Sequence, residues 1–180
     1  MPGPLVWIDC EMTGLNHQTD NIIEICCLLT DAKLDLIERN GFERVIHVPK
    51  EKLDGMDEWC QTTHSKTGLI QKVLDSTNTA PQVESELLDY LKKHMSQREG
   101  ILAGNSVHVD RLFLLREFPK VTDFLHYRLI DVSSIKEIGY RHNPMLMEKV
   151  PKKSLNHSAR SDILESIQEL KWYYDNYLTR

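Results

Sequence analysis

The chain has 180 residues, of which 41% are hydrophobic and 27% are charged, and its formal net charge is −5. This length predicts a single domain spanning 1–180, with a core large enough to need no disulfide support. The negative charge, together with basic runs no longer than Lys152–Lys153, argues against a protein that grips long nucleic acid, so any nucleic-acid substrate is expected to be short.

The first predicted element is a strand that begins at Val6 and contains two acids. The stretch VWIDCEMTGL, residues 6–15, opens with β-branched and aromatic residues that favour a strand. Asp9 and Glu11 are one residue apart, and because side chains alternate along a strand, both carboxylates point to the same face. Two like charges on a half-buried surface repel each other and resist desolvation, so the pattern predicts that a cation lies between them.

The rest of the chain predicts more strands early and then strands that alternate with helices. Strands are expected at 21–29, 42–48, 101–103 and 127–130. Helices are expected after the capping box at 79–82 and over 109–118. A last helix is predicted by an apolar stripe made of Ile163, Ile167, Leu170, Tyr174 and Tyr177. This order predicts an α/β fold with a mixed sheet.

The cysteines indicate a reducing environment. Cys26 and Cys27 are adjacent, Cys10 and Cys60 are isolated, and their spacing forms neither a disulfide framework nor a zinc site. No signal peptide, transit segment or apolar run of membrane-spanning length is present in the sequence. We therefore expect an intracellular protein with no membrane partner, located in the cytoplasm, the mitochondrion or both.

Two further acids are placed where they can join the first pair. Asp110 follows the predicted strand 101–103, and Asp162 lies at the start of the last helix, five residues after His157. Ligands in open α/β sheets bind beyond the carboxyl ends of strands, so Asp9, Glu11, Asp110 and Asp162 form a candidate cluster. Oxygen ligands of this kind suit Mg²⁺ or Mn²⁺, and two such ions can stabilise both the attacking and the leaving oxygen of a phosphoryl transfer. His157 is then the candidate general base.

The order D-x-E, middle Asp and H-x4-D resembles the DEDDh exonucleases, which have the ribonuclease-H-like fold. The stretches WIDCEMTGL, GNSVHVDRLFL and HYRLIDVSS, and the final pattern H-x-A-x-x-D-I-x-E-S-I-x-E-L, resemble the oligoribonuclease family, which degrades the shortest RNA fragments. The resemblance runs from Leu5 to Tyr174. It implies a ribonuclease-H-like α/β fold, in which a mixed five-stranded sheet is flanked by helices.

The resemblance also implies a role for each matching residue. Asp9, Glu11, Asp110 and Asp162 would hold two divalent ions, Mg²⁺ or Mn²⁺, and His157 would be the base. The remaining implied residues bind substrate: Leu15 against a base, Trp59 against the base at the 3′ end, and Ser106, Arg128 and Ser133 on the 5′ phosphate, with Tyr127 and the neighbouring His126 closing that end.

Tyr127 would come from the partner subunit, because members of this family are homodimers. One departure is visible, since the family commonly has an acid before the last Asp whereas Ser161 stands here, preceded by Arg160.

The predicted function is 3′-to-5′ hydrolysis of very short oligoribonucleotides, dinucleotides especially, to nucleoside 5′-monophosphates. Taken singly, each acid is explained as well by an exposed strand edge or by a helix dipole. Two alternatives are a DNA-directed DEDDh exonuclease and an inactive metal-binding scaffold module. The negative charge disfavours long DNA, and a base beside four intact acids disfavours a scaffold.

Overall fold

The computed structural model describes residues 3–154 and 158–179. The elements in chain order are β1 (Leu5–Met12), β2 (Ile22–Thr30), β3 (Phe42–Val45), α1 (Lys50–Asp54), α2 (Glu58–Lys66), α3 (Leu69–Asp75), α4 (Ala80–His94), β4 (Ile101–Gly104), α5 (Val107–Glu117), α6 (Pro119–Phe124), β5 (Leu129–Asp131), α7 (Val132–His142), α8 (Pro144–Met147) and α9 (Ala159–Asn176). None of the described helices has both the length and the apolar composition that a bilayer span requires.

The strands form a mixed five-stranded sheet in the order β3-β2-β1-β4-β5. β1, β2 and β3 pair antiparallel, whereas β1, β4 and β5 pair parallel. The predicted fold class is therefore confirmed. β1 lies at the centre of the sheet, so its side chains are covered from both faces.

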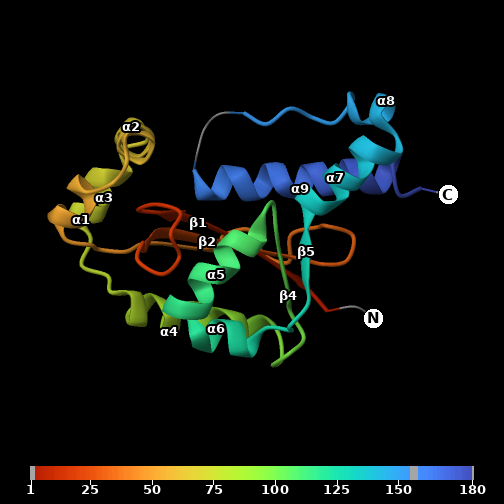
Figure 1. Cartoon of the computed structure of the whole chain (residues 1–180). Coiled ribbons are helices and arrows are strands. Elements are labelled where there is room, and N and C mark those ends of the chain that lie inside the picture. Colours follow the sequence, from red (N-terminus) through yellow and green to blue (C-terminus); the bar gives the residue numbers. More distant parts are fainter. Residues whose placement is uncertain (1–2, 155–157, 180) are drawn as a thin grey trace.

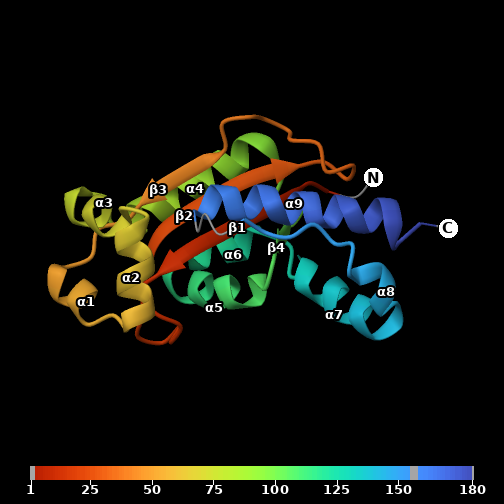
Figure 2. The same cartoon turned by 90° about the horizontal axis from the view of Figure 1, so that it is seen from above.

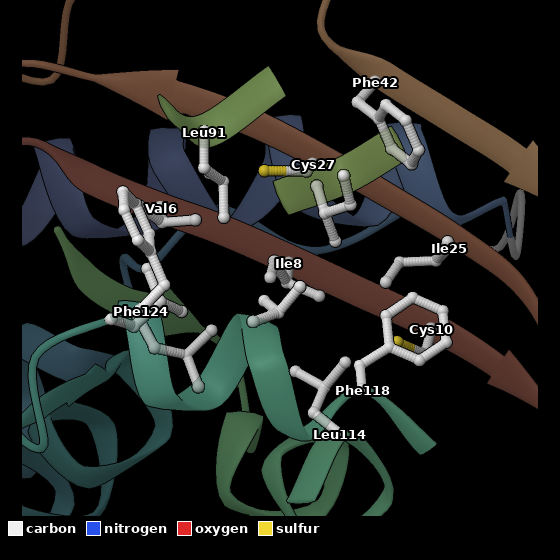
Figure 3. Packing of buried hydrophobic residues seen from close by; sticks show 14 of the residues in the cluster. Val6, Ile8, Cys10, Ile25, Cys27, Phe42, Leu91, Leu114, Phe118 and Phe124 are labelled. Carbon is white, nitrogen blue, oxygen red and sulfur yellow. The ribbon is translucent and has the colours of Figure 1, made fainter. Parts of the chain in front are cut away.

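Helices cover the two faces of the sheet unequally (Figure 1, Figure 2). The long helix α9 crosses one face, and α4, α5 and α6 cover the other. Val6, Ile8 and Cys10 of β1 pack toward α4–α6 (Figure 3), whereas Trp7 packs with residues of α9 on the opposite face. The alternation of β1 therefore puts Asp9 and Glu11 on the α9 side.

Helices α1, α2 and α3 form a separate small layer beside the carboxyl end of β1 (Figure 1, Figure 2). Their core contains Leu53, Cys60, Leu69 and Val73, and it rests on Ile23 of β2. The sequence patterns predicted no helix in this region, because each of these helices has at most nine residues and little room for a periodic stripe.

Most of the predicted elements are present, with shifted ends. Thr79 is the N-cap of α4, and its hydroxyl accepts a hydrogen bond from the Gln82 amide at 3.3 Å. In α9 the apolar stripe holds up to Leu170, after which Tyr173 is the fully buried aromatic and Tyr174 is 38% exposed. The buried face continues from Leu170 to Tyr173, which packs with Ile163 and Ile167 in the core cluster on the α9 side of the sheet.

Candidate active site

Three carboxylates from two elements meet on the α9 face of the sheet. α9 packs across β1 and β2, and Asp162 stands in its first turn. The carboxylate oxygens of Asp9, Glu11 and Asp162 lie within 4.8 Å of one another. Residues more than 150 positions apart in the chain therefore form one acidic group.

Asp110 joins this group from the other side of β1. It lies in the first turns of α5 and is only 6% exposed. Its Oδ1 accepts a hydrogen bond at 3.0 Å from the backbone amide of Cys10, the residue between Asp9 and Glu11. The structure thus groups three of the four predicted metal ligands within 4.8 Å and places the fourth, Asp110, beside them in the lining of the same pocket.

The cluster is electrostatically unfavourable without a cation. Burial, reinforced by the charges of the neighbouring acids, raises the pKa of Asp9 well above its usual value. Burial first, and then the charges of Glu24, Asp162 and Asp110, raise the pKa of Glu11 to about 8. Burial raises the pKa of Asp110 to about 7, although the bond from Cys10 opposes the shift.

The donor set fits a hard divalent cation. All four side chains offer oxygen atoms, which Mg²⁺ and Mn²⁺ prefer. Among the described residues, Lys153 is a cation whose charge lowers the pKa of Asp9. One lysine does not balance four acids, of which Asp110 is buried and the other three are half-buried, so their ionised forms call for further positive charge.

A pocket of about 490 Å³ opens over the acids. Asp9, Glu11 and Asp110 contribute to its lining, and Leu15 and Trp59 line it from the β1–β2 loop and from α2. Leu15 is 81% exposed and Trp59 is 62% exposed. Large apolar side chains that stay exposed beside a pocket with acids in its lining are typical of a ligand surface.

Short-range contacts hold the loop that presents Leu15. The Asp20 carboxylate accepts hydrogen bonds from the Asn16 amide at 3.0 Å and from the Thr13 hydroxyl at 3.1 Å. A Cβ atom on Gly14 would lie 2.4 Å from this carboxylate, so a larger residue there would displace the Asp20 side chain that braces the turn. Leu15 is therefore presented by a braced turn.

Trp59 stands in the first turn of α2, whose N-cap is Asp57. The Asp57 side chain accepts a hydrogen bond from the Cys60 amide at 2.7 Å. The cap begins the helix at the residue before Trp59, so it sets where the indole enters the pocket.

His64 is a pocket residue that the sequence analysis missed. It is 2% exposed, its Nε2 donates to the Met12 carbonyl at 2.9 Å, and its Nδ1 is 3.9 Å from a carboxylate oxygen of Glu11. The carbonyl can only accept, so the proton on Nε2 is assigned by this contact. The sequence around His64 contained no signal of its burial, because α2 has no strong apolar stripe.

Asp131 organises the residues predicted for the 5′ phosphate. Its Oδ1 accepts hydrogen bonds from the Ser106 amide at 2.8 Å, the Ser133 amide at 3.0 Å and the Ser133 hydroxyl at 2.6 Å, and its Oδ2 accepts one from His108 Nδ1 at 3.0 Å. Burial raises the pKa of Asp131, but the bonds from Ser133, His108 and Ser106 outweigh it, and the pKa falls below its usual value.

Ser106 and Ser133 are therefore neighbours, as the sequence predicted, but through a carboxylate that it did not single out. Ser106 has a φ of 54°, a left-handed conformation that is rare for residues with a Cβ. Since a hydroxyl has one proton, Ser133 can donate to a phosphate only after it leaves Asp131.

His126, Tyr127 and Arg128 form a second group at the amino end of β5. The rings of His126 and Tyr127 stack with centroids 4.6 Å apart, and the Arg128 guanidinium carbon is 5.5 Å from the Tyr127 ring centroid. Tyr127 is 65% exposed. Three residues of extended chain, about 10 Å, separate Arg128 from Asp131 at the carboxyl end of the strand.

The proposed base, His157, lies outside the described residues. The chain on its far side is well anchored, since Ser158 caps α9 and its hydroxyl accepts from the Ser161 amide at 3.3 Å. Arg160 donates to the carbonyls of Asn40 and Arg39 at 2.7 and 2.8 Å. Arg160 stands where the sequence departs from the family pattern. Its two hydrogen bonds fasten the start of α9 to the loop before β3.

Comparison with known proteins agrees with this geometry. The exonuclease family RNase_T matches residues 6–170. The mitochondrial oligoribonuclease of Saccharomyces cerevisiae is 54% identical over 97% of this chain and 68% of its own length. An oligoribonuclease of Neisseria meningitidis is 42% identical over 97% of this chain and 92% of its own length.

Solved structures show the same fold at greater distance. The zinc-bound complex of Escherichia coli exonuclease I with single-stranded DNA superposes with a TM-score of 0.70 at 14% identity. The match covers 98% of this chain but 41% of that one, so the chain spans less than half of that protein. The family match and the high identity to oligoribonucleases show that the chain belongs to the RNase_T exonuclease family and, within it, to the oligoribonucleases.

Proposed function

We propose that this 3′-to-5′ exoribonuclease acts on very short oligoribonucleotides, dinucleotides especially, and releases nucleoside 5′-monophosphates. The observation that supports this most directly is a single pocket that joins a buried acidic cluster to two exposed apolar side chains, Leu15 and Trp59. The names of the similar proteins point the same way. The whole of 1–180 would act as one exonuclease domain.

The apolar wall would hold the 3′ end of the substrate. Trp59 offers a ring face on which any base can stack, and Leu15 would pack against a base beside it. This wall would place the last phosphodiester over the acids. Because stacking is nearly independent of base identity, we expect little sequence preference.

Asp9, Glu11, Asp110 and Asp162 would hold two divalent ions, Mg²⁺ or Mn²⁺. When bound, such ions supply Lewis-acid activation of water and neutralise charge on the phosphate. The raised pKa values of Asp9, Glu11 and Asp110 support this assignment, because a cation would favour their ionised forms.

His157 would act as the general base. It would take the proton from the attacking water as the new oxygen–phosphorus bond forms, while the bond to the 3′-oxygen of the preceding nucleotide breaks in line. The imidazolium formed there would return its proton to solvent, and the leaving 3′-oxygen would take up a proton from solvent to become a hydroxyl. The support for this role is the family pattern, with His157 five residues before Asp162.

The 5′ end would be held by Ser106, Arg128 and Ser133 in one subunit. Tyr127 and the adjacent His126 would close that end from the partner subunit of a homodimer. The 65% exposure of Tyr127 on the single chain supports a role across an interface. A site closed at both ends admits only short chains.

The compartment is proposed on similar grounds. All four cysteines are buried and free, as expected in a reducing compartment. A similar protein carries the name of a mitochondrial enzyme. We infer that the protein works in the cytoplasm, the mitochondrion or both.

The deciding experiment is incubation with a 5′-phosphorylated RNA dinucleotide and with a 20-residue RNA, with Mg²⁺ or with chelator. We expect nucleoside 5′-monophosphates from the dinucleotide, faster than from the 20-mer, and none with chelator. Preference for long single-stranded DNA would instead indicate a DNA exonuclease. Metal binding with no turnover of any of these would indicate a scaffold.

A further inference from the structure

A buried acid behind the metal cluster has no part in the chemistry described above. Glu169 lies seven residues after Asp162 on α9, which places it on the same face of the helix, about 10 Å further along the axis. It is 2% exposed. Buried ionic groups contribute little net stability compared with apolar residues of the same size, so its presence calls for another reason.

The partners of Glu169 lead back to the pocket. Its Oε1 accepts from the Tyr173 hydroxyl at 2.8 Å and lies 3.4 Å from the Lys136 ammonium. Its Oε2 accepts from Nδ2 of Asn105 at 3.0 Å. Asn105 is the residue directly after β4, and it lines the pocket beside the acids.

This bond determines which end of the Asn105 amide is available. A carboxylate only accepts hydrogen bonds, so the amide must turn its NH₂ group to Glu169. The carbonyl oxygen, Oδ1, is then turned away from Glu169, and beside it remains the second N–H of the amide, since the bond to Glu169 uses one of two. Glu169 therefore leaves Asn105 with an acceptor for a ligand in the pocket.

An oligoribonucleotide offers few donors near the scissile bond. Its phosphate oxygens and its leaving 3′-oxygen are acceptors, and the amino groups of bases vary with sequence. The terminal 3′-hydroxyl belongs to the sugar on the Leu15 and Trp59 side. The donor present in every sequence next to the leaving oxygen is the 2′-hydroxyl of the sugar on the 5′ side.

We propose that Asn105 accepts a hydrogen bond from this 2′-hydroxyl and that Glu169 is the positioning residue that orients the amide. The inference rests on the proposed function for the placement of the substrate. It assigns the preference for RNA over DNA to one side chain. A neutral hydrogen bond of this kind corresponds to about three- to tenfold in affinity.

The test uses four dinucleotides with a 5′ phosphate: all ribose, all deoxyribose, deoxyribose in the 5′ sugar only, and deoxyribose in the 3′ sugar only. We expect the wild type to lose about three- to tenfold in kcat/KM when the 5′ sugar lacks its 2′-hydroxyl, mainly through KM. Asn105→Ala and Glu169→Leu, which has no atom to accept from the Asn105 amide, should abolish this discrimination while keeping any effect of the 3′ sugar.

Tyr173→Phe is the matched control, because it removes a hydrogen bond from the same carboxylate without touching Asn105. It should keep the sugar preference whatever its effect on the unfolding temperature. If Asn105→Ala discriminates between the sugars as the wild type does, the proposal is overturned. If Glu169→Leu keeps the preference as Tyr173→Phe does, the positioning role is overturned.

Failure of the proposed function gives a different result. A wild type that cleaves none of the dinucleotides contradicts the proposed function, and equilibrium binding of the same four molecules then decides the inference. Binding that weakens without the 5′-side 2′-hydroxyl in the wild type but not in Asn105→Ala supports it. Equal cleavage of all four by the wild type contradicts the inference and leaves the exonuclease activity standing.

Discussion

At the scale of single residues, the site is defined by acids whose burial conflicts with their charge. Asp9 and Glu11 stand on a central strand, where an apolar residue would fit at no electrostatic cost. Burial and the negative charges of neighbouring acids raise their pKa values. A bound cation would favour the ionised forms of these acids. Without metal, ionising them should therefore lower the free energy of unfolding.

The first prediction concerns the pH dependence of stability without metal. The pKa of Glu11 rises from 4.5 to about 8 on folding, so between these values the folded state binds more protons than the unfolded state. The free energy of unfolding must then fall as pH rises from about 4.5 to about 8. Thermal unfolding in chelator at pH 5 and pH 8 measures this fall, and Mn²⁺ should reverse it at pH 8.

Glu11→Gln provides the control for that measurement. The amide does not titrate, so the variant should lose much of the pH dependence in chelator and much of the response to Mn²⁺. A wild type whose stability in chelator rises over the same pH range would contradict the assignment of raised pKa values.

The second prediction concerns Trp59. Trp59→Ala should leave the unfolding temperature nearly unchanged, since the side chain is 62% exposed, and should raise KM for a dinucleotide roughly five- to hundredfold. The range corresponds to about 1–3 kcal/mol for one stacked base. Tyr174→Ala, which removes an exposed aromatic from α9, should change neither quantity. A Trp59→Ala protein that simply unfolds would show that the indole is structural.

At the scale of elements, the site depends on where α2 begins. This helix presents Trp59 and His64, and its N-cap Asp57 accepts the bond from the Cys60 amide. The α4 helix has an equivalent cap in Thr79, which lies on the far face of the sheet from α9. Removing either cap should destabilise its helix, but only the Asp57 cap belongs to a helix that lines the pocket. The pair therefore distinguishes an effect on stability from an effect on substrate binding.

The third prediction uses this pair. Asp57→Ala should lower the unfolding temperature slightly and raise KM for a dinucleotide by up to about tenfold, because the stacking residue remains but is less well placed. Thr79→Ala should lower the unfolding temperature without changing KM. Equal KM values for the two variants would show that the first turn of α2 does not position the substrate.

At the scale of the whole molecule, the proposed site is incomplete in one chain. The group of His126, Tyr127 and Arg128 lies at the amino end of β5, whereas Ser106 and Ser133 gather at its carboxyl end. A two-fold partner can return Tyr127 to the other subunit's site, because an isologous interface uses the same residues on both sides.

The fourth prediction is complementation between two defective subunits. In a mixed dimer of Tyr127→Ala and Asp162→Asn, one site has both defects, and the other has intact acids and an intact borrowed tyrosine. Activity should recover to about half of the wild-type value per dimer, as expected for two independent sites. No recovery despite proven subunit exchange would show that Tyr127 acts within its own chain or has no role.

The sequence by itself determined the first strand, the helices α4, α5 and α9, and the four acids. Alternation along residues 5–12 places Asp9 and Glu11 on one face whatever surrounds them, because it follows from the geometry of an extended chain. The helix that presents Asp162 was equally predictable from its periodic apolar stripe. These properties depend on neighbours in the chain, so no tertiary contact is needed to predict them.

Only the tertiary structure decided which polar groups support the acids. His64 meets the carbonyl of Met12 across 52 residues, His108 meets Asp131 across 23, and Asn105 meets Glu169 across 64. These contacts form when helices settle onto the ends of strands, and nothing in the local patterns specifies that packing. The sequence could name the acids that need a cation, but the hydrogen bonds that orient the pocket around them exist only once the layers have packed.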